Sequence, residues 1–390
     1  VEDEATGIPP ENTAIVRSTG ATSLAVEPAE TTPFRTPTAV LPTHNPTTVL
    51  PTQTPTPGQV ATKQPTAQPT PTMAATDEYA QEPYLGIWLT REELGRLPMS
   101  GPPWEEVVRF ASNRSLSPDL NDQDDVVNIR VLANALLFAR TGDEEHREKV
   151  VGALETITYE NTEKGGNTLA LGRELVAYVI AADLINLPQY APQFNLEFED
   201  KLRELLTKKL DGRTLTSTNE ERPNNWGTHA GASRAAVALY LGDTAELRRT
   251  AQVFQGWLGN RKTYAEFIYG DDLSWHCDPD RPLGINPQGC KKDGHDLGGA
   301  QPEEMRRGAE FQWPPEETGY AWEALQGALV QAEILRRAGY DVWNWEDQAL
   351  LRAVNFLYDI GWHPEGDDEW LVWLINSAYC TSYQENSPTI

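Results

Sequence analysis

The most regular feature of this chain is a helical spacing of apolar residues, which begins near Tyr84 and continues toward the C-terminal end. Residues 124–140 show it clearly, with one broad apolar face formed by Val127, Val131, Leu132, Ala135, Leu136 and Ala139. Gly142 follows at the position of a left-handed C-terminal cap, and Asp143 can begin the next helix. This pattern predicts a hairpin of two helices.

The order helix, glycine, helix recurs along the chain, with Gly242 and Gly339 as the later glycines. Further helices are predicted over residues 171–185, 198–210, 230–241, 243–257, 323–338 and 345–358. Alternation typical of a strand is weak and confined to residues 370–375. Repeated hairpins with short loops predict an all-α fold, which we interpret as an incomplete α/α toroid with a central cleft, and an open solenoid is the alternative.

The N-terminal fifth of the chain has a different composition. Between residues 31 and 73, 24 of 43 residues are Thr or Pro, and Phe34 is the only aromatic one. Such a segment buries too little apolar surface to offset its ordering entropy, so residues 1–80 are predicted to be a disordered linker and residues 81–390 the catalytic domain. Thr/Pro spacers are typical of exported proteins, which favours a secreted, cell-surface or periplasmic location with attachment through the linker. A cytoplasmic low-complexity tail is the alternative.

The charge of the chain excludes one class of partner. Its 390 residues contain 58 acidic and 32 basic side chains, for a net charge of −26. Only 8 acidic and 3 basic side chains fall in the first 78 residues, which leaves 50 and 29 to the rest. Nucleic-acid binding needs clustered Lys and Arg, so it is not expected. A monomer is expected.

The three cysteines are too few for a disulfide scaffold. Cys277 and Cys290 flank a loop rich in Gly and Pro and are predicted to form one bridge in an oxidising compartment, which leaves Cys380 over. A zinc site built from Cys277, Cys290 and a histidine is the alternative, but the spacing fits no regular zinc motif. No metal or cofactor is expected.

The first polar cluster lies at the predicted start of a helix, where Asn224, Asn225 and Trp226 precede His229. A helix N-terminus presents free N–H groups, and the small residues after His229 allow another backbone or a ligand to approach closely. A capping asparagine and a core histidine are the structural alternatives.

Two later stretches carry further candidates. Trp275, His276, Lys291 and Lys292 flank the loop between the cysteines and would suit a wall that faces an anionic sugar. The next stretch contains a pair of arginines, a tryptophan that could stack on a sugar, a phenol at a helix start and a carboxylate: Arg306, Arg307, Trp313, Tyr320 and Glu323. Arginine recognises carboxylates bidentately, although both guanidinium groups could instead pair with Glu303 and Glu304 at the surface.

These residues resemble the alginate lyase superfamily of α/α-toroid polysaccharide lyases, which also contains glucuronan lyases. The family carries Asn-Asn-His at a helix start and, much later, Arg-Gly followed by a Tyr that begins a helix. Asn224-Asn225, Arg307-Gly308 and Tyr320 match these elements. Trp226 stands where the family has histidine, and the nearest imidazole is His229. The resemblance spans about residues 88–379.

The resemblance implies β-elimination in a uronate-containing polysaccharide, alginate or glucuronan. Asn225 and Arg307 would stabilise charge on the substrate carboxylate, and Tyr320 would be the acid at the leaving group. The base is either His229, alone or as a partner, or Tyr320 itself for one configuration at C5. The residues predicted to bind the substrate are Asn224, Trp226, Trp275, His276, Lys292, Arg306, Trp313 and Glu323.

Two other functions fit the same sequence. An α/α-toroid glycoside hydrolase would use two carboxylates such as Asp272 and Glu323. A non-catalytic glycan-binding module would keep the aromatic residues without needing the phenol of Tyr320 for chemistry.

Overall fold

A computed structural model describes residues 86–113 and 116–383 of the chain. The structure divides the chain after Asp77, and every described residue lies in the unit Glu78–Ile390. The prediction of a linker over residues 1–80 lies outside the described residues. No helix in the described ranges is both long and apolar enough to cross a membrane.

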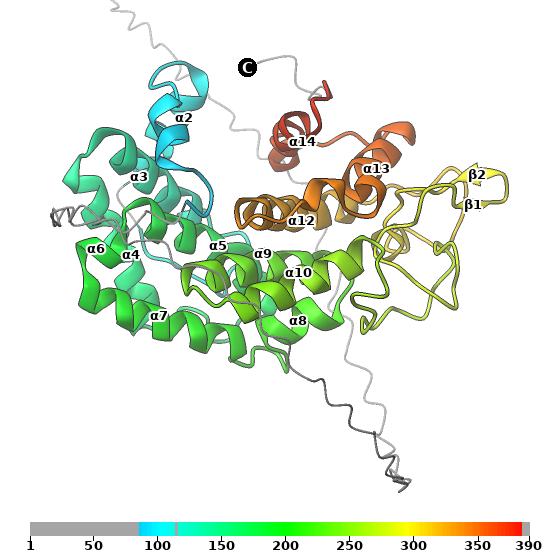
Figure 1. The fold of residues 1–390 in the computed structure, drawn as a ribbon, viewed down its shortest axis with the longest axis horizontal. Coiled ribbons are helices and arrows are strands. Elements are labelled where there is room, and N and C mark those ends of the chain that lie inside the picture. Colours follow the sequence, from blue (N-terminus) through cyan, green and yellow to red (C-terminus); the bar gives the residue numbers. More distant parts are fainter. Residues whose placement is uncertain (1–85, 114–115, 384–390) are drawn as a thin grey trace, which may run out of the picture. The chain divides into compact units, whose positions relative to one another are not determined.

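The described unit is mostly helical (Figure 1), so the prediction of an all-α fold of helix hairpins, of the kind that builds an α/α toroid, is confirmed. The helices are α1 (Arg91–Arg96), α2 (Pro102–Ala111), α3 (Val127–Thr141), α4 (Glu144–Tyr159), α5 (Thr168–Leu184), α6 (Leu187–Tyr190), α7 (Pro192–Thr207), α8 (Leu215–Glu221), α9 (Asn225–Tyr240), α10 (Thr244–Leu258), α11 (Pro302–Met305), α12 (Tyr320–Arg337), α13 (Trp345–Asp359) and α14 (Leu371–Tyr379). Two short antiparallel strands, β1 (Lys291–Lys292) and β2 (His295–Asp296), form a hairpin that the sequence did not predict.

The predicted helix boundaries at glycine are confirmed. Gly142 adopts the left-handed conformation after α3, and the side chain of Asp143 accepts the N–H of Glu145 at the start of α4. Gly242 and Gly339 have positive φ angles after α9 and α12. Residues 370–375, in contrast, do not form a strand. Trp370 is the N-cap residue of α14, and residues 371–375 belong to this helix, where Leu371, Val372 and Ile375 are buried on one face.

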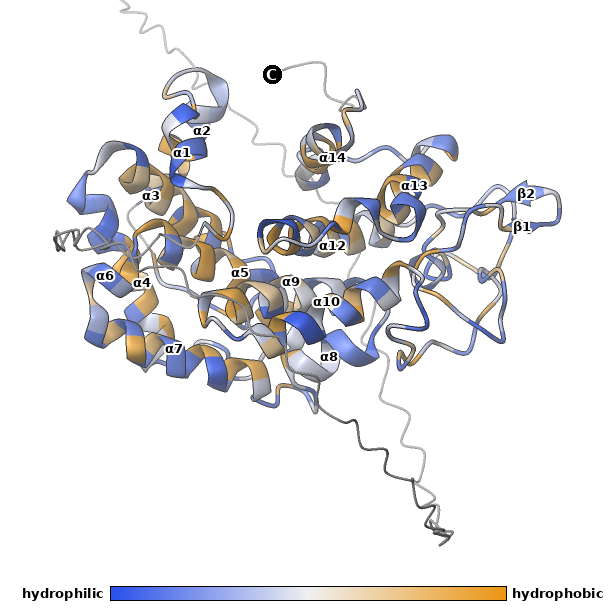
Figure 2. Cartoon of the chain, in the orientation of Figure 1, coloured by the Kyte–Doolittle hydropathy of each residue, from blue (hydrophilic) through white to orange (hydrophobic). Residues whose placement is uncertain are grey.

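The core is organised around α9, which packs against α5, α8, α10 and α12. Figure 2 shows that α5 is largely hydrophobic, whereas α7 has a hydrophobic and a hydrophilic side. Both α5 and α9 are buried on nearly all sides, and α9 carries mainly small residues. Its one guanidinium is paired internally: the fully buried Arg234 contacts the carboxylates of Glu220 and Glu246 at 3.0 and 2.6 Å.

Glycines allow the helices on either side of α9 to approach its backbone. A Cβ atom at Gly172 of α5 would lie 2.9 Å from the nitrogen of Ala230, and one at Gly327 of α12 would lie 2.4 Å from the nitrogen of His229. The turn of α9 that contains His229 is therefore held between two close crossings.

Replacement of Gly327 by Ala tests this crossing. The added methyl would overlap the backbone of α9, and overpacking of this kind costs about 1–3 kcal/mol of folding free energy. Gly152→Ala in α4 is the matched control, because its Cβ meets no atom within 4 Å, and it should gain about 0.5–1 kcal/mol. Urea unfolding measures the free energy of unfolding of both variants. Equal stability of the two variants would contradict the close approach of α12 to α9 at Gly327.

Candidate functional site

The first turn of α9 is bonded to acidic side chains from two other helices. The backbone N–H of Asn225 donates to Oε1 of Glu304 in α11 at 2.5 Å, and its Nδ2 donates to Oε2 of Glu323 in α12 at 2.9 Å. Asn224, the N-cap residue, makes no side-chain cap bond, so Glu304 supplies an acceptor that the free N–H groups of the helix require. The helices α9, α11 and α12 therefore meet at Asn225.

Arg307 and Tyr320 lie next to this junction. Tyr320 is the first residue of α12, one turn before Glu323, and side chains three positions apart on a helix are neighbours. The guanidinium carbon of Arg307 lies 3.9 Å from the centre of the Tyr320 ring, and Arg307 also acts electrostatically on Glu304. The contacts thus join the predicted residues Asn225, Arg307 and Tyr320 at one place.

Four buried polar atoms at this junction have no hydrogen-bond partner among the described residues. They are Oδ1 of Asn224, Oδ1 of Asn225, Nε2 of His229 and Oε2 of Glu304. Buried polar groups are almost always hydrogen-bonded, and leaving one unpaired costs about 1–3 kcal/mol. A concentration of such atoms on one helix end is typical of a site that binds a polar ligand.

The carboxyl group of Glu304 is neutral at pH 7. Its side chain is 1% exposed, and burial raises its pKa from 4.5 to about 8, against the opposing effects of the Asn225 N–H and Arg307. The protonated group has one O–H to donate while its other oxygen accepts from Asn225.

His229 is also neutral for the same reason, although burial moves its pKa in the opposite direction. Its side chain is 7% exposed, and burial, assisted by the positive charge of Arg173, lowers its pKa to about 3, although a hydrogen bond with the backbone of Glu323 acts the other way. An imidazole with so low a pKa is a weak base. Of the two roles predicted for His229, the geometry therefore favours the partner of the base over the base itself.

Three arginines surround this end of α9 without an ion-pair partner within 4 Å among the residues described: Arg173, Arg222 and Arg307. Arg222 is half-buried, with its guanidinium carbon 4.4 Å from the centre of the Trp226 ring. Burial and the neighbouring arginines lower its pKa from 12.5. In a chain with a net charge of −26, this local excess of positive charge favours an anionic ligand.

Comparison with known families bears on this arrangement. A family model described as alginate lyase matches residues 65–262, just over half of the chain. The chain belongs to the alginate lyase family. The match includes Asn224, Asn225 and His229 and ends before Arg307 and Tyr320.

Among solved structures, an alginate lyase from Bacteroides ovatus is similar over 66% of this chain, with 16% sequence identity and a TM-score of 0.41. The similarity also covers 66% of the Bacteroides protein, so the present chain spans slightly less than two thirds of the length of that protein. A comparison with curated protein sequences finds no match.

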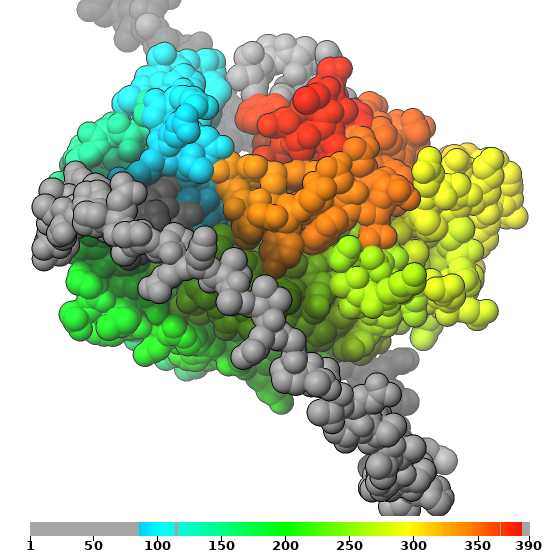
Figure 3. Space-filling model, viewed as in Figure 1, coloured from blue at the N-terminus to red at the C-terminus, as the bar shows by residue number. Residues whose placement is uncertain are grey.

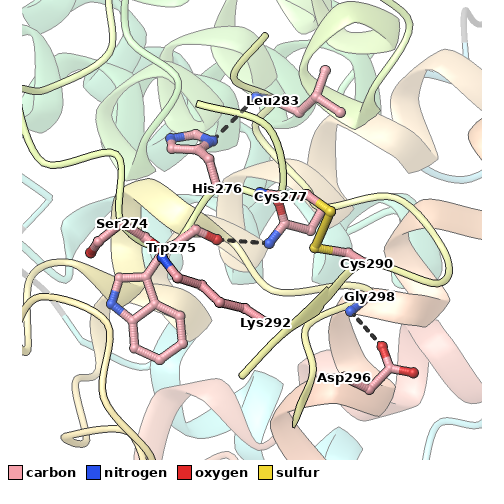
Figure 4. The surroundings of a disulfide bond; sticks show 10 residues. Ser274, Trp275, His276, Cys277, Leu283, Cys290, Lys292, Asp296 and Gly298 are labelled. Atoms are coloured by element: carbon pink, nitrogen blue, oxygen red, sulfur yellow. Dashed lines mark hydrogen bonds between the residues drawn. A yellow bond between two sulfur atoms is a disulfide. The ribbon is translucent and has the colours of Figure 1, made fainter. Parts of the chain in front are cut away.

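Other residues predicted to bind the substrate, Trp275, His276 and Lys292, lie around the disulfide loop instead (Figure 4). Trp275 is 1% exposed, its Nε1 donates to the carbonyl of Ala309 at 2.9 Å, and its ring packs edge-on against Phe311. The prediction that Trp275 faces a sugar is wrong, because its side chain is buried in the protein. The ammonium group of Lys292 is bonded to the carbonyl of Ser274 and lies 4.7 Å from the Phe311 ring centre.

The carboxylate of Glu303 contacts two more of the predicted residues, Arg306 and His276. Arg306 donates to Oε2 of Glu303 at 2.9 and 3.1 Å, as the alternative of pairing with a neighbouring carboxylate predicts. Arg307 does not follow this alternative, because its guanidinium stacks on the Tyr320 ring. Nε2 of His276 lies 4.0 Å from Oε1 of Glu303. Trp313, 39% exposed, stacks on His295 with ring centres 4.2 Å apart.

The alternatives drawn from the sequence find less support. The prediction of a bridge between Cys277 and Cys290 is confirmed, and a disulfide leaves no thiolate there for zinc. Of the two carboxylates considered for a hydrolase, Asp272 accepts the N–H of Ser274 and Glu323 accepts from Asn225. No contact within the described ranges joins those two side chains.

Sequence reasoning missed several members of the site, among them Glu304 and Arg173. Glu304 was considered only as a surface partner of arginine, and nothing in its local pattern indicates that α11 buries it against α9. Arg173 lies inside an apolar helix next to Gly172, and a lone cation beside a glycine in such a segment was the available signal.

The titration of Glu304 predicts how stability depends on pH. Because its folded-state pKa of about 8 lies above 4.5, the folded protein keeps a proton that the unfolded chain has lost between these values. The stabilisation is therefore complete below about pH 4.5 and is lost as the pH rises through about 8. Glu304→Gln keeps the acceptor for Asn225 but does not titrate, so wild type should lose stability relative to this variant between about pH 5 and pH 8. Parallel pH profiles of the free energy of unfolding would contradict a buried neutral Glu304.

Proposed function

We propose that this chain is a polysaccharide lyase that cleaves a uronate-containing polysaccharide, alginate or glucuronan, by β-elimination. The observation that carries the proposal is the junction of α9, α11 and α12, where an amide, a guanidinium and a phenol meet among unpaired polar atoms. Membership of the alginate lyase family supports it.

The reaction sets a clear requirement on the site. A base removes the proton from C5 of the uronate, the C5–H electron pair becomes the C4=C5 double bond, and the bond from C4 to the glycosidic oxygen breaks. The departing oxygen takes up a proton. Since the C5 proton is weakly acidic, the negative charge that spreads onto the carboxylate must be stabilised in the transition state.

Asn225 and Arg307 are suited to that stabilisation. The amide group of Asn225 has two N–H donors, of which Glu323 accepts one, so the other remains for a carboxylate oxygen. Arg307 brings a positive charge without a carboxylate partner among the described residues, and Arg222 adds a second nearby charge. The neutral Glu304 can donate its O–H in the same region without repelling the substrate.

We assign the proton transfers to Tyr320. His229 is buried and has a pKa of about 3, so we assign it a hydrogen-bonding role instead. Tyr320 acts as a phenolate that takes the C5 proton and, as the resulting phenol, gives this proton to the departing glycosidic oxygen. Its ring lies next to the guanidinium of Arg307, which can stabilise the negative charge of the phenolate.

The disulfide supports a further part of the proposal. Bridges such as Cys277–Cys290 persist in oxidising compartments, and we propose a secreted or cell-surface location on this basis and on the Thr/Pro-rich composition of the N-terminal segment.

Incubation with alginate and with polyglucuronate tests the function. Cleavage should raise the ultraviolet absorbance of the conjugated C4=C5 product, and Tyr320→Phe should lower the rate by at least about 10²-fold, because it removes the transferable proton. Tyr159→Phe, which removes an exposed phenol bonded to Glu197, is the control and should retain full activity.

Three outcomes would overturn the proposal. Growth of reducing ends at constant absorbance would indicate a hydrolase. Retention on a glycan column without any product would indicate a binding module. Full activity of Tyr320→Phe would remove the phenol from the mechanism.

A further inference from the structure

A cavity of about 480 Å³ lies away from the α9 junction, between the end of α10, the disulfide loop and the start of α13. Its volume falls within the range of about 300–1,000 Å³ typical of small-molecule sites. The polar side chains that line it include Asn260, Arg261, Lys262, His276, Arg281 and Glu346. In Figure 3 the yellow segment that contains the disulfide loop borders the orange α13 region.

The loop side of the cavity is held in a fixed conformation. The Cys277–Cys290 bridge closes the loop, and Nδ1 of the buried His276 accepts the N–H of Leu283 at 3.4 Å (Figure 4). Nη1 of Arg261 donates to the carbonyl of Pro282 at 2.8 Å. These bonds fix the wall before any ligand arrives, which lowers the entropic cost of binding.

The opposite wall contains a strained segment. Glu346, Asp347 and Gln348 have φ angles of 49°, 55° and 56°, a left-handed conformation that residues with a side chain rarely adopt in succession. Arg352 bonds the carbonyl oxygens of Glu346 and Asp347, and the amide of Asn260 donates to Oε1 of Glu346 at 2.9 Å. Strain of this kind persists where surrounding contacts enforce it, commonly at ligand sites. Here it holds the Glu346 carboxylate at the cavity wall.

The charged side chains that line the cavity indicate which class of ligand it suits. Arg261, Lys262 and Arg281 face the cavity together with the carboxylates of Asp278 and Glu346. Neither Lys262 nor Arg281 forms an ion pair within the part of the chain that the structure describes. Arginine binds carboxylates, and carboxylates accept from hydroxyl groups, so a lining of both signs suits a molecule that combines one anionic group with several hydroxyls.

We propose that this cavity is a second binding site for a single sugar-acid unit, with Arg281 bound to the carboxylate and Glu346 to a hydroxyl group. The site goes beyond the lyase function and does not depend on it, because binding requires no bond cleavage. It adjoins α11 through His276, whose Nε2 lies 4.0 Å from Glu303, the neighbour of Glu304.

Titration calorimetry with glucuronate, glucose and inorganic phosphate tests the ligand class. Glucuronate as a monosaccharide has no glycosidic bond to break, so catalysis does not interfere. We expect glucuronate to bind at least about tenfold more tightly than glucose or phosphate, because only glucuronate supplies both the anion and the hydroxyl groups. Equal affinity for phosphate, or no measurable binding of glucuronate, would overturn the proposal.

Variants locate the binding. Arg281→Ala should weaken glucuronate binding at least about tenfold, and Arg248→Ala, an exposed arginine of α10 outside the cavity lining, should leave it unchanged. Loss of binding in Arg307→Ala with full binding in Arg281→Ala would move the ligand to the α9 junction and contradict the second site. Failure of the lyase function would appear instead as absence of an unsaturated product from the polymers.

Discussion

The close packing of α9 between α5 and α12 is the constraint on which the rest of the structure depends. Gly172 and Gly327 allow the backbones of the outer helices to approach α9 on either side of the turn that contains His229. No side chain remains between the helices at these points, so the position of one helix start fixes that of the others. The amide of Asn225 and the first turn of α12 are thereby brought within hydrogen-bond distance.

The burial that holds α9 also sets the charges of the site. Glu304 is kept protonated and His229 unprotonated, because neither charged form is well solvated in that interior. The cations nearby are arginines without a carboxylate partner in the described ranges. An acidic protein can therefore attract an anionic sugar locally, since charges more than about 8 Å away are screened at physiological ionic strength.

Features set by local sequence were predictable, and those set by tertiary packing were not. Gly142 with Asp143 marks a helix boundary through backbone geometry alone, and the spacing of Cys277 and Cys290 across a loop allows a bridge. The apolar alternation of residues 370–375 is equally compatible with a short helix, and burial of one face decides for α14.

The same distinction applies to the candidate site. Asn225, Arg307 and Tyr320 were predictable because their residue types and order follow a known family. Trp275 was assigned wrongly, since an aromatic residue in a polar loop gives no sign of whether the loop folds over it. Glu304 was missed because its role as the acceptor for a helix start depends on a neighbour 79 positions away.

A crystal structure of the Tyr320→Phe variant with a bound oligouronate tests the central claim most directly. The account predicts one sugar carboxylate within hydrogen-bond distance of both Nδ2 of Asn225 and the guanidinium of Arg307, with C5 of that sugar facing the ring at position 320. An oligosaccharide bound with its carboxylates turned away from Asn225 and Arg307 would contradict it.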